Sequence, residues 1–131
     1  MVKKTPSPAK LRELVMQALY QKEMTGSSNT VLIKQFKQNY KNLNLNNFET
    51  YLKEIKNNIL DIDSTINKHT NINIDQISKI ELAILKQAIY EIKNSNLDKP
   101  IIISEAIRLA KRFGQDSSHK FVNALLDKAD N

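Results

Sequence analysis

The chain has 131 residues, a formal net charge of +6 at pH 7, a 40% hydrophobic share and no cysteine. This length predicts one domain, the positive charge favours anionic partners such as nucleic acid, and the lack of cysteine excludes disulfides and thiolate chemistry. No apolar run approaches the roughly 18 residues of a membrane span, and the first ten residues lack the apolar segment of a secretory signal, so a cytoplasmic location is expected.

The N-terminus is basic, because four cations come before the first acidic residue of the chain, Glu13. They are Lys3, Lys4, Lys10 and Arg12. A basic arm that leads into a helix is a common way to contact phosphates. The alternative is a tail whose charges are only solvated. We expect residues 1–7 to form a flexible basic arm.

Two helices are predicted in the first third of the chain. The first lies between Ser7, which can cap it in front of Pro8, and Gly26, which can end it. Its apolar face consists of Leu11, Leu14, Val15, Ala18 and Leu19. A second helix is expected over residues 30–40, and an asparagine-rich loop over residues 42–47.

A long third helix is predicted over residues 47–69, where apolar residues recur in alternating steps of four and three. These residues are Phe48, Leu52, Ile55, Ile59, Ile62 and Ile66. Such a heptad seam can form a coiled-coil dimer, but more often it packs inside its own bundle. We therefore expect packing within the chain, with a homodimer as the open alternative.

The next predicted helix opens with Ser78 and Glu81, which form a capping-box pattern. Residues 71–76 should form a turn or one short helical turn before it. The helix is apolar on most sides, which predicts that it is the buried centre of the fold. A loop over residues 94–99 and an extended segment over residues 100–103 should follow.

The last two predicted helices are joined by a glycine. Ser104 can cap the first of them, and Gly114 can end it in the left-handed conformation. The second can be capped by Asp116, Ser117 or Ser118. The whole chain is thus predicted to be all-α, with six or seven helices in one domain.

The corner between these two helices collects groups that can contact RNA. They are Arg108, Lys111 and Arg112 on the first helix, and Lys120, Phe121 and Asn123 near the start of the second. Cations and a helix N-terminus can meet phosphates, and a ring can stack on a base. The alternative is a solvated charged face, and these residues alone favour that alternative.

No catalytic or metal-binding group of residues is visible in the sequence. His69 and His119 lie far apart, and neither has a metal-ligand partner at helical spacing. There is no glycine-rich phosphate loop either. We therefore expect a protein that is not an enzyme and that needs no cofactor.

Three stretches resemble the bacterial NusB transcription antitermination factors. RELVMQALYQ at residues 12–21 resembles the first helix of that family, and ISKIELAILKQAIYEI at residues 77–92 resembles its central helix. The pattern SEAI-x-LAK-x-FG-x(3)-SHKFVN-x-LLDK at residues 104–128 resembles its C-terminal signature and is the most specific of the three. Together they cover somewhat under half of the chain.

The resemblance implies an all-helical protein made of two small packed subdomains. NusB proteins pair with the ribosomal protein NusE, and the pair binds the boxA element of nascent RNA within the antitermination complex on RNA polymerase. By position in the family motifs, Tyr20 and Glu81 should face NusE. The residues expected to contact RNA are Lys3, Lys4, Lys10, Arg12, Lys111, Arg112, Lys120, Phe121 and Asn123.

Two departures from the family pattern bear on RNA affinity. Pro8, Ala9 and Lys10 stand where relatives often carry a run of arginines, so Lys3 and Lys4 are expected to compensate. Ser117 stands where many relatives have an acid or asparagine, which removes a charge near the expected phosphates. The alternative functions are the RNA-binding domain of an RNA cytosine methyltransferase and a helical adaptor that binds proteins only.

Overall fold

The computed structural model describes residues 2–130 of the chain. Over these residues the chain forms seven α-helices and one short 3-10 turn, and no strand. In chain order they are α1 (Pro8–Thr25), α2 (Asn29–Asn39), α3 (Asn46–Asn57), α4 (Ile59–Lys68), η1 (Ile74–Gln76), α5 (Lys79–Asn94), α6 (Lys99–Phe113) and α7 (Ser118–Lys128). The predicted all-α fold is confirmed, and none of these helices combines the length and apolar character needed to cross a membrane.

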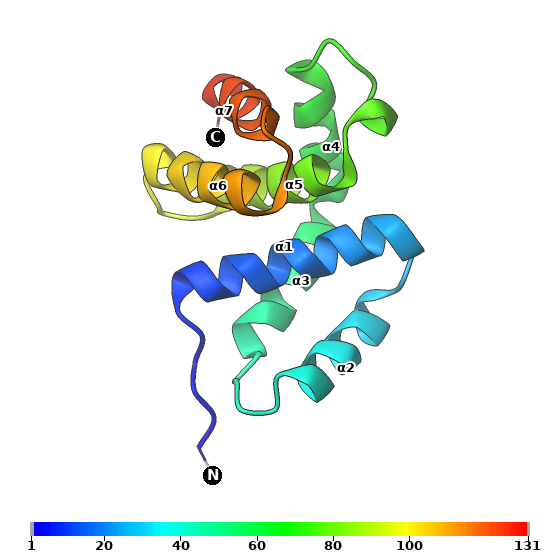
Figure 1. Cartoon of the computed structure of the whole chain (residues 1–131), viewed down its shortest axis with the longest axis vertical. Coiled ribbons are helices and arrows are strands. Elements are labelled where there is room, and N and C mark those ends of the chain that lie inside the picture. Colours follow the sequence, from blue (N-terminus) through cyan, green and yellow to red (C-terminus); the bar gives the residue numbers. More distant parts are fainter. Residues whose placement is uncertain (1, 131) are drawn as a thin grey trace.

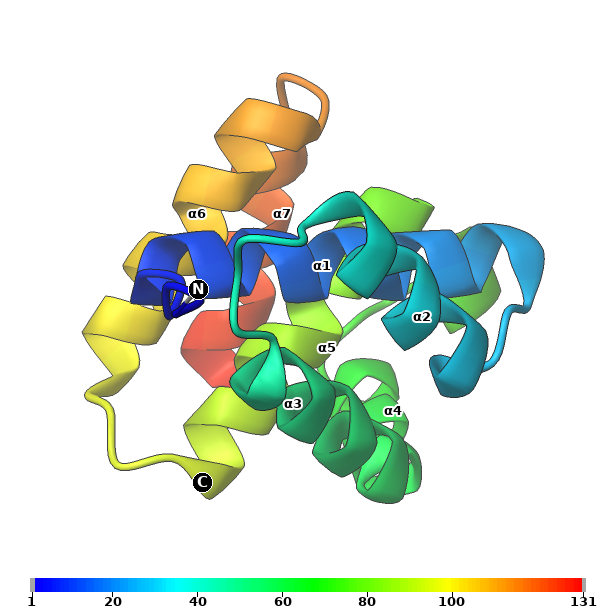
Figure 2. The same cartoon turned by 90° about the horizontal axis from the view of Figure 1, so that it is seen from below.

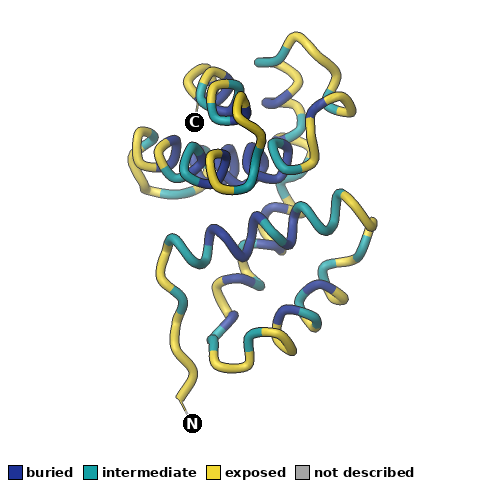
Figure 3. Tube along the Cα trace, in the orientation of Figure 1, coloured by how far each residue is buried: buried dark blue, intermediate teal, exposed yellow. Residues whose placement is uncertain are grey.

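The helices form two groups that pack on each other through α1 and α5. Figure 1 shows α1, α2 and α3 in one group and α4, α5, α6 and α7 in the other. Buried residues concentrate where α1 faces α5 (Figure 3). Leu14 of α1 and Leu85 and Ile89 of α5 are fully buried there. One continuous hydrophobic core therefore spans both groups, and α5 is its centre, as its apolar sides predict.

The predicted third helix is wrong as a single helix, because the chain is interrupted at Asn58. The Asn58 side-chain amide donates to the backbone oxygen of Glu54 at 2.7 Å, and such local bonds compete with the helical ladder. The break lets α3 pack on α1 while α4 packs on α5. Along the seam, Phe48 and Ile66 are fully buried within the chain, so the predicted intramolecular packing is confirmed.

Helix α6 begins earlier than expected, so the predicted extended segment over residues 100–103 is wrong. Asp98 occupies the N-cap, Pro100 lies in the first turn, and the Asp98 carbonyl accepts from the N–H of Ile101 at 3.0 Å. Proline suits this position because its missing N–H would have no helical partner there. Ser104 is therefore an exposed residue inside α6 and not its cap.

The two glycines end their helices for different reasons. Gly26 has a φ of 71°, and its N–H donates to the carbonyl of Lys22 at 2.8 Å, as the left-handed end of α1 requires. Gly114 is extended instead, so its predicted left-handed conformation is wrong. A Cβ at Gly114 would lie 2.7 Å from both the Ala110 carbonyl oxygen and the Ser118 Cβ. Glycine is needed there for close approach.

Candidate nucleic-acid interface

The corner between α6 and α7 is fastened to the start of α5 by a buried serine. The Ser118 hydroxyl donates to the Glu81 carboxylate at 2.7 Å and accepts from the Gln115 N–H at 3.0 Å. Ser78 caps α5 as predicted, because its hydroxyl accepts from the Glu81 N–H at 3.2 Å. The Glu81 carboxylate therefore orients the first turn of α7, a contact that the capping pattern alone does not reveal.

The three α7 residues of the family motif differ in exposure. Lys120 is exposed, and Asn123 and Phe121 are half-buried. The Phe121 ring packs against the core at one side, and it also lines an open hollow of about 310 Å³ beside residues 69–72. Its neighbour Val122 is fully buried, as its place in the apolar stripe predicts. Phe121 thus lies at the border of the core with part of its side chain accessible.

Glu13 brings together cations from α1 and α6. Its two carboxylate oxygens pair with Arg112 at 2.8 Å and with Lys10 at 3.9 Å. The side chains of Arg112 and Lys10 remain 57% and 41% exposed, whereas that of Glu13 is 9% exposed. Arg112 also lies 5.0 Å from the centroid of the Phe113 ring, and its neighbour Lys111 is exposed. These cations are oriented but still accessible to a further anion.

Arg12 does not share this surface, contrary to expectation. Its guanidinium donates three hydrogen bonds to Glu91, at 3.0, 3.2 and 2.9 Å, and one to Glu105 at 3.3 Å, and the residue is 7% exposed. Burial opposes its charge, but the bonds and charge of Glu91 outweigh burial and raise the pKa of Arg12. A phosphate would have to displace these carboxylates, so Arg12 instead joins α1 to α5 and α6.

The N-terminal arm is held in place over its described residues, 2–7, although we expected it to be flexible; Met1 lies outside the described residues. The Lys4 N–H donates to the Asn42 carbonyl at 3.0 Å, and the Lys4 carbonyl accepts from the Asn44 N–H at 2.7 Å. Figure 1 shows the arm beside the loop that joins α2 and α3. These two bonds position the exposed side chains of Lys3 and Lys4.

The residues expected to face a protein partner lie on the first and central helices. Tyr20 is half-buried on α1 and packs against the core, and Glu81 is half-buried in the first turn of α5. Both keep accessible surface. The sequence reasoning missed the acids that organise the basic residues. Glu91 did give a signal, because it stands between the apolar residues Tyr90 and Ile92, and a charge flanked by core residues predicts a buried ion pair.

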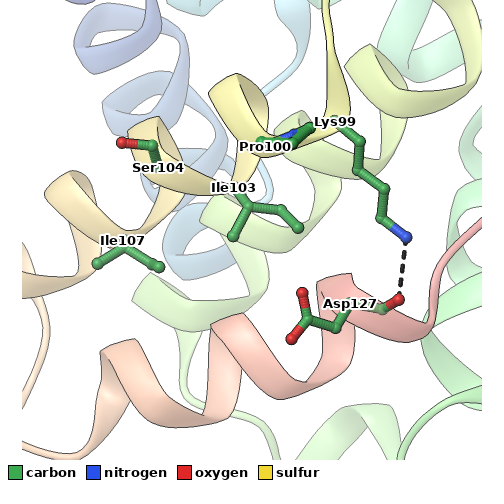
Figure 4. Close-up of a pocket in the computed structure, with 6 residues that line it drawn as sticks. All are labelled: Lys99, Pro100, Ile103, Ser104, Ile107 and Asp127. Atoms are coloured by element: carbon green, nitrogen blue, oxygen red, sulfur yellow. Dashed lines mark hydrogen bonds between the residues drawn. The ribbon is translucent and has the colours of Figure 1, made fainter.

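A separate apolar groove lies between the start of α6 and the end of α7. Its volume is about 480 Å³, and Pro100, Ile103 and Ile107 form its apolar wall (Figure 4). The Lys99 ammonium crosses one end and donates to the Asp127 backbone oxygen at 2.9 Å. The groove holds no paired acid and base. Across the described residues, no group of His, Asp and Glu side chains has a metal-binding arrangement.

Comparison with known proteins assigns the chain to a family. The NusB family model matches residues 9–131. Transcription antitermination protein NusB of Tolumonas auensis is 36% identical over 122 residues, which cover 91% of this chain and 88% of that protein. The NusB protein of Escherichia coli O139:H28 is 34% identical over 121 residues, which cover 90% of this chain and 87% of that protein.

Solved structures agree with this assignment. A structure of T. maritima NusB has a TM-score of 0.85 and 27% identity, covering 95% of this chain and 91% of that one. The fold is also that of a chain from the crystal structure of the antitermination factors NusB and NusE with dsRNA, with a TM-score of 0.80, 22% identity and coverages of 91% and 92%. This chain, with its SHKFVN motif at the start of α7, belongs to the NusB family.

Proposed function

We propose that this protein is an RNA-binding transcription antitermination factor that acts in the cytoplasm. It pairs with the ribosomal protein NusE and binds boxA-type single-stranded RNA within the antitermination complex on RNA polymerase. Its relatives are named transcription antitermination proteins, and this name describes no enzymatic activity. A chain of the same fold occurs in a solved complex with NusE and dsRNA.

The observation that most supports this proposal is that Lys10 and Arg112 both pair with Glu13. Each cation is oriented by the carboxylate and keeps exposed surface, so a phosphate binds without first ordering two long side chains. The exposed Lys111 and Lys120 add positive charge at the α6–α7 corner. Such a surface binds the RNA backbone by electrostatics and counterion release.

Phe121 supplies the contact that distinguishes single strands from duplexes. Its ring borders an open hollow, where an unpaired base can stack on it. A paired base in an RNA duplex already stacks within its own helix and would have to leave it. Asn123, half-buried on the same helix, offers an amide that can read a base edge. The protein itself therefore works by binding and positioning.

An RNA titration tests this function directly. The boxA-type RNA, a scrambled RNA of equal length and the boxA-type RNA annealed to its complement are titrated with and without NusE. We expect tightest binding to the single-stranded boxA-type RNA with NusE present. Its log–log salt slope should become steeper by about −0.7 for each phosphate contact. Equal affinity for the scrambled RNA in the presence of NusE would overturn the proposal.

A second experiment tests NusE pairing through Glu81. Glu81→Gln keeps an oxygen that accepts from Ser118 but removes the charge, so pairing with NusE should weaken while thermal stability stays close to wild type. Ser118→Ala is the matched control, because it disturbs the corner and leaves the carboxylate. If both variants weaken pairing equally in a pull-down, Glu81 acts only by orienting α7.

A further inference from the structure

A second group of exposed lysines lies on α2 and directly after it. Lys34 and Lys37 are three residues apart on one face of α2, and Lys41 follows directly after the C-cap Tyr40; these three residues are here called the α2 lysine face. All three are exposed, and together they line an open hollow of about 590 Å³. None of them is among the residues that the family motifs assign to RNA.

The α2 lysine face is continuous with the N-terminal arm. Lys3 and Lys37 line one hollow of about 280 Å³ with the α2–α3 loop. Lys10 lies 5.5 Å above the ring of Tyr40, the residue that ends α2. Figure 2, seen from below, shows this loop crossing in front of α1. A line of cations therefore leads from the Glu13 pair to α2.

The charged residues between Glu23 and Glu49 are all positive. No acidic residue occurs between Glu23 and Glu49, although the whole chain has 14. Glu49 pairs with Lys37, which leaves Lys34 and Lys41 outside the ion pairs of the described residues. The same segment is rich in amides, namely Asn29, Gln35, Gln38, Asn39, Asn42, Asn44, Asn46 and Asn47. Cations mixed with amides and a tyrosine suit a polyanion that also carries bases, which is single-stranded RNA.

We propose that RNA flanking the recognised element runs along the arm onto the α2 lysine face, where its phosphates are bound without regard to sequence. This inference rests on the proposed function, because the recognised element places the flanking RNA. The α2 lysine face would lengthen the contacted RNA and steepen the salt dependence. It would not change which element is preferred, because phosphate contacts carry no base information.

The test compares two RNAs, the boxA-type element alone and the same element extended by unstructured nucleotides at either end. Wild-type protein should bind one of the extended RNAs about tenfold more tightly at low salt, since two to three phosphate contacts are added. Lys34→Gln/Lys41→Gln should lose most of that gain and reduce the salt slope by roughly 1 to 1.5, while leaving the short element unaffected.

Lys56→Gln/Lys68→Gln is the control, because it removes the same charge from exposed residues of α3 and α4 and should keep the gain. Equal wild-type affinity for short and extended RNAs would overturn this inference and leave the proposed function intact. An equal loss of the gain in both double variants would also overturn this inference. So would competition for the protein by a polyglutamate that is as effective as competition by the RNA extension. Failure to bind either RNA would instead overturn the proposed function.

Discussion

Arg12 belongs to a basic sequence motif, yet its side chain is buried and bonded to acids of the same chain. Its bonds to Glu91 and Glu105 hold α1 against α5 and α6, and Tyr51 also approaches Glu91 at 3.4 Å. A buried carboxylate that is paired with a cation lowers the stability of the fold little. If the cation is removed, the carboxylate is left charged in an apolar surrounding, which is strongly destabilising.

We therefore expect Arg12→Ala to destabilise the protein by about 3–5 kcal/mol, measured by urea denaturation at pH 7. The double variant Arg12→Met/Glu91→Met removes both charges and should recover most of that loss. A single variant that stays as stable as wild type but binds RNA poorly would instead identify Arg12 as an RNA contact.

The Phe121→Ala variant tests whether the Phe121 ring, at the border of the core, contacts RNA. Because its ring is half-buried, we expect Phe121→Ala to lose about 1–3 kcal/mol of RNA binding. Its cost in stability should stay below the roughly 3–5 kcal/mol of a fully buried phenylalanine. Val122→Ala is the control, because this buried neighbour should affect stability alone. A Phe121→Ala protein that melts much earlier, yet binds RNA like wild type while folded, would place the ring in the core only.

At the scale of the elements, the α6–α7 hairpin depends on how closely its two helices approach at Gly114. Gly114→Ala would place a Cβ against Ser118 and should cost about 1–3 kcal/mol through overpacking. Because Ser118 orients the first turn of α7, RNA affinity should fall as well. Denaturation and RNA titration of the folded variant measure the two effects.

Comparing Gly26→Ala with Gly114→Ala separates the effect of a positive φ from the effect of close contact with an added Cβ. Gly26 has a positive φ, but no atom lies within 4 Å of an added Cβ. The Gly26→Ala variant should lose about 1 kcal/mol of stability and keep its RNA affinity, because none of the proposed RNA contacts lies at the end of α1. If both glycine variants leave RNA affinity unchanged, the hairpin does not position the RNA contacts.

At the scale of the whole molecule, the two groups of helices share one core and should unfold together. We expect a single cooperative transition by circular dichroism and by tyrosine fluorescence. Leu52→Ala on α3, a buried position, should destabilise by about 2–5 kcal/mol. It should also lower amide protection on α7 by hydrogen exchange. Two separate transitions, or a loss of protection confined to α1–α3, would show independent subdomains.

The sequence by itself determined the number and order of the helices to within one break, the central place of α5 and the family. These properties rest on local chemistry, since caps, prolines and apolar spacing act within a few residues of each other. The SHKFVN block likewise predicted the residues at the start of α7. Ser7, Gly26 and Ser78 end or begin their helices as predicted for that reason.

Only the tertiary structure decided the break at Asn58, the partners of Arg12 and the positions of the arm and of Gly114. The break at Asn58 lets α3 pack on α1 and α4 pack on α5, and these contacts join residues that are distant in the chain. Arg12 is buried because carboxylates from α5 and α6 reach it. A cation in the sequence looks the same whether it meets an acid, a phosphate or water, because the packing of elements distant in the chain selects its partner.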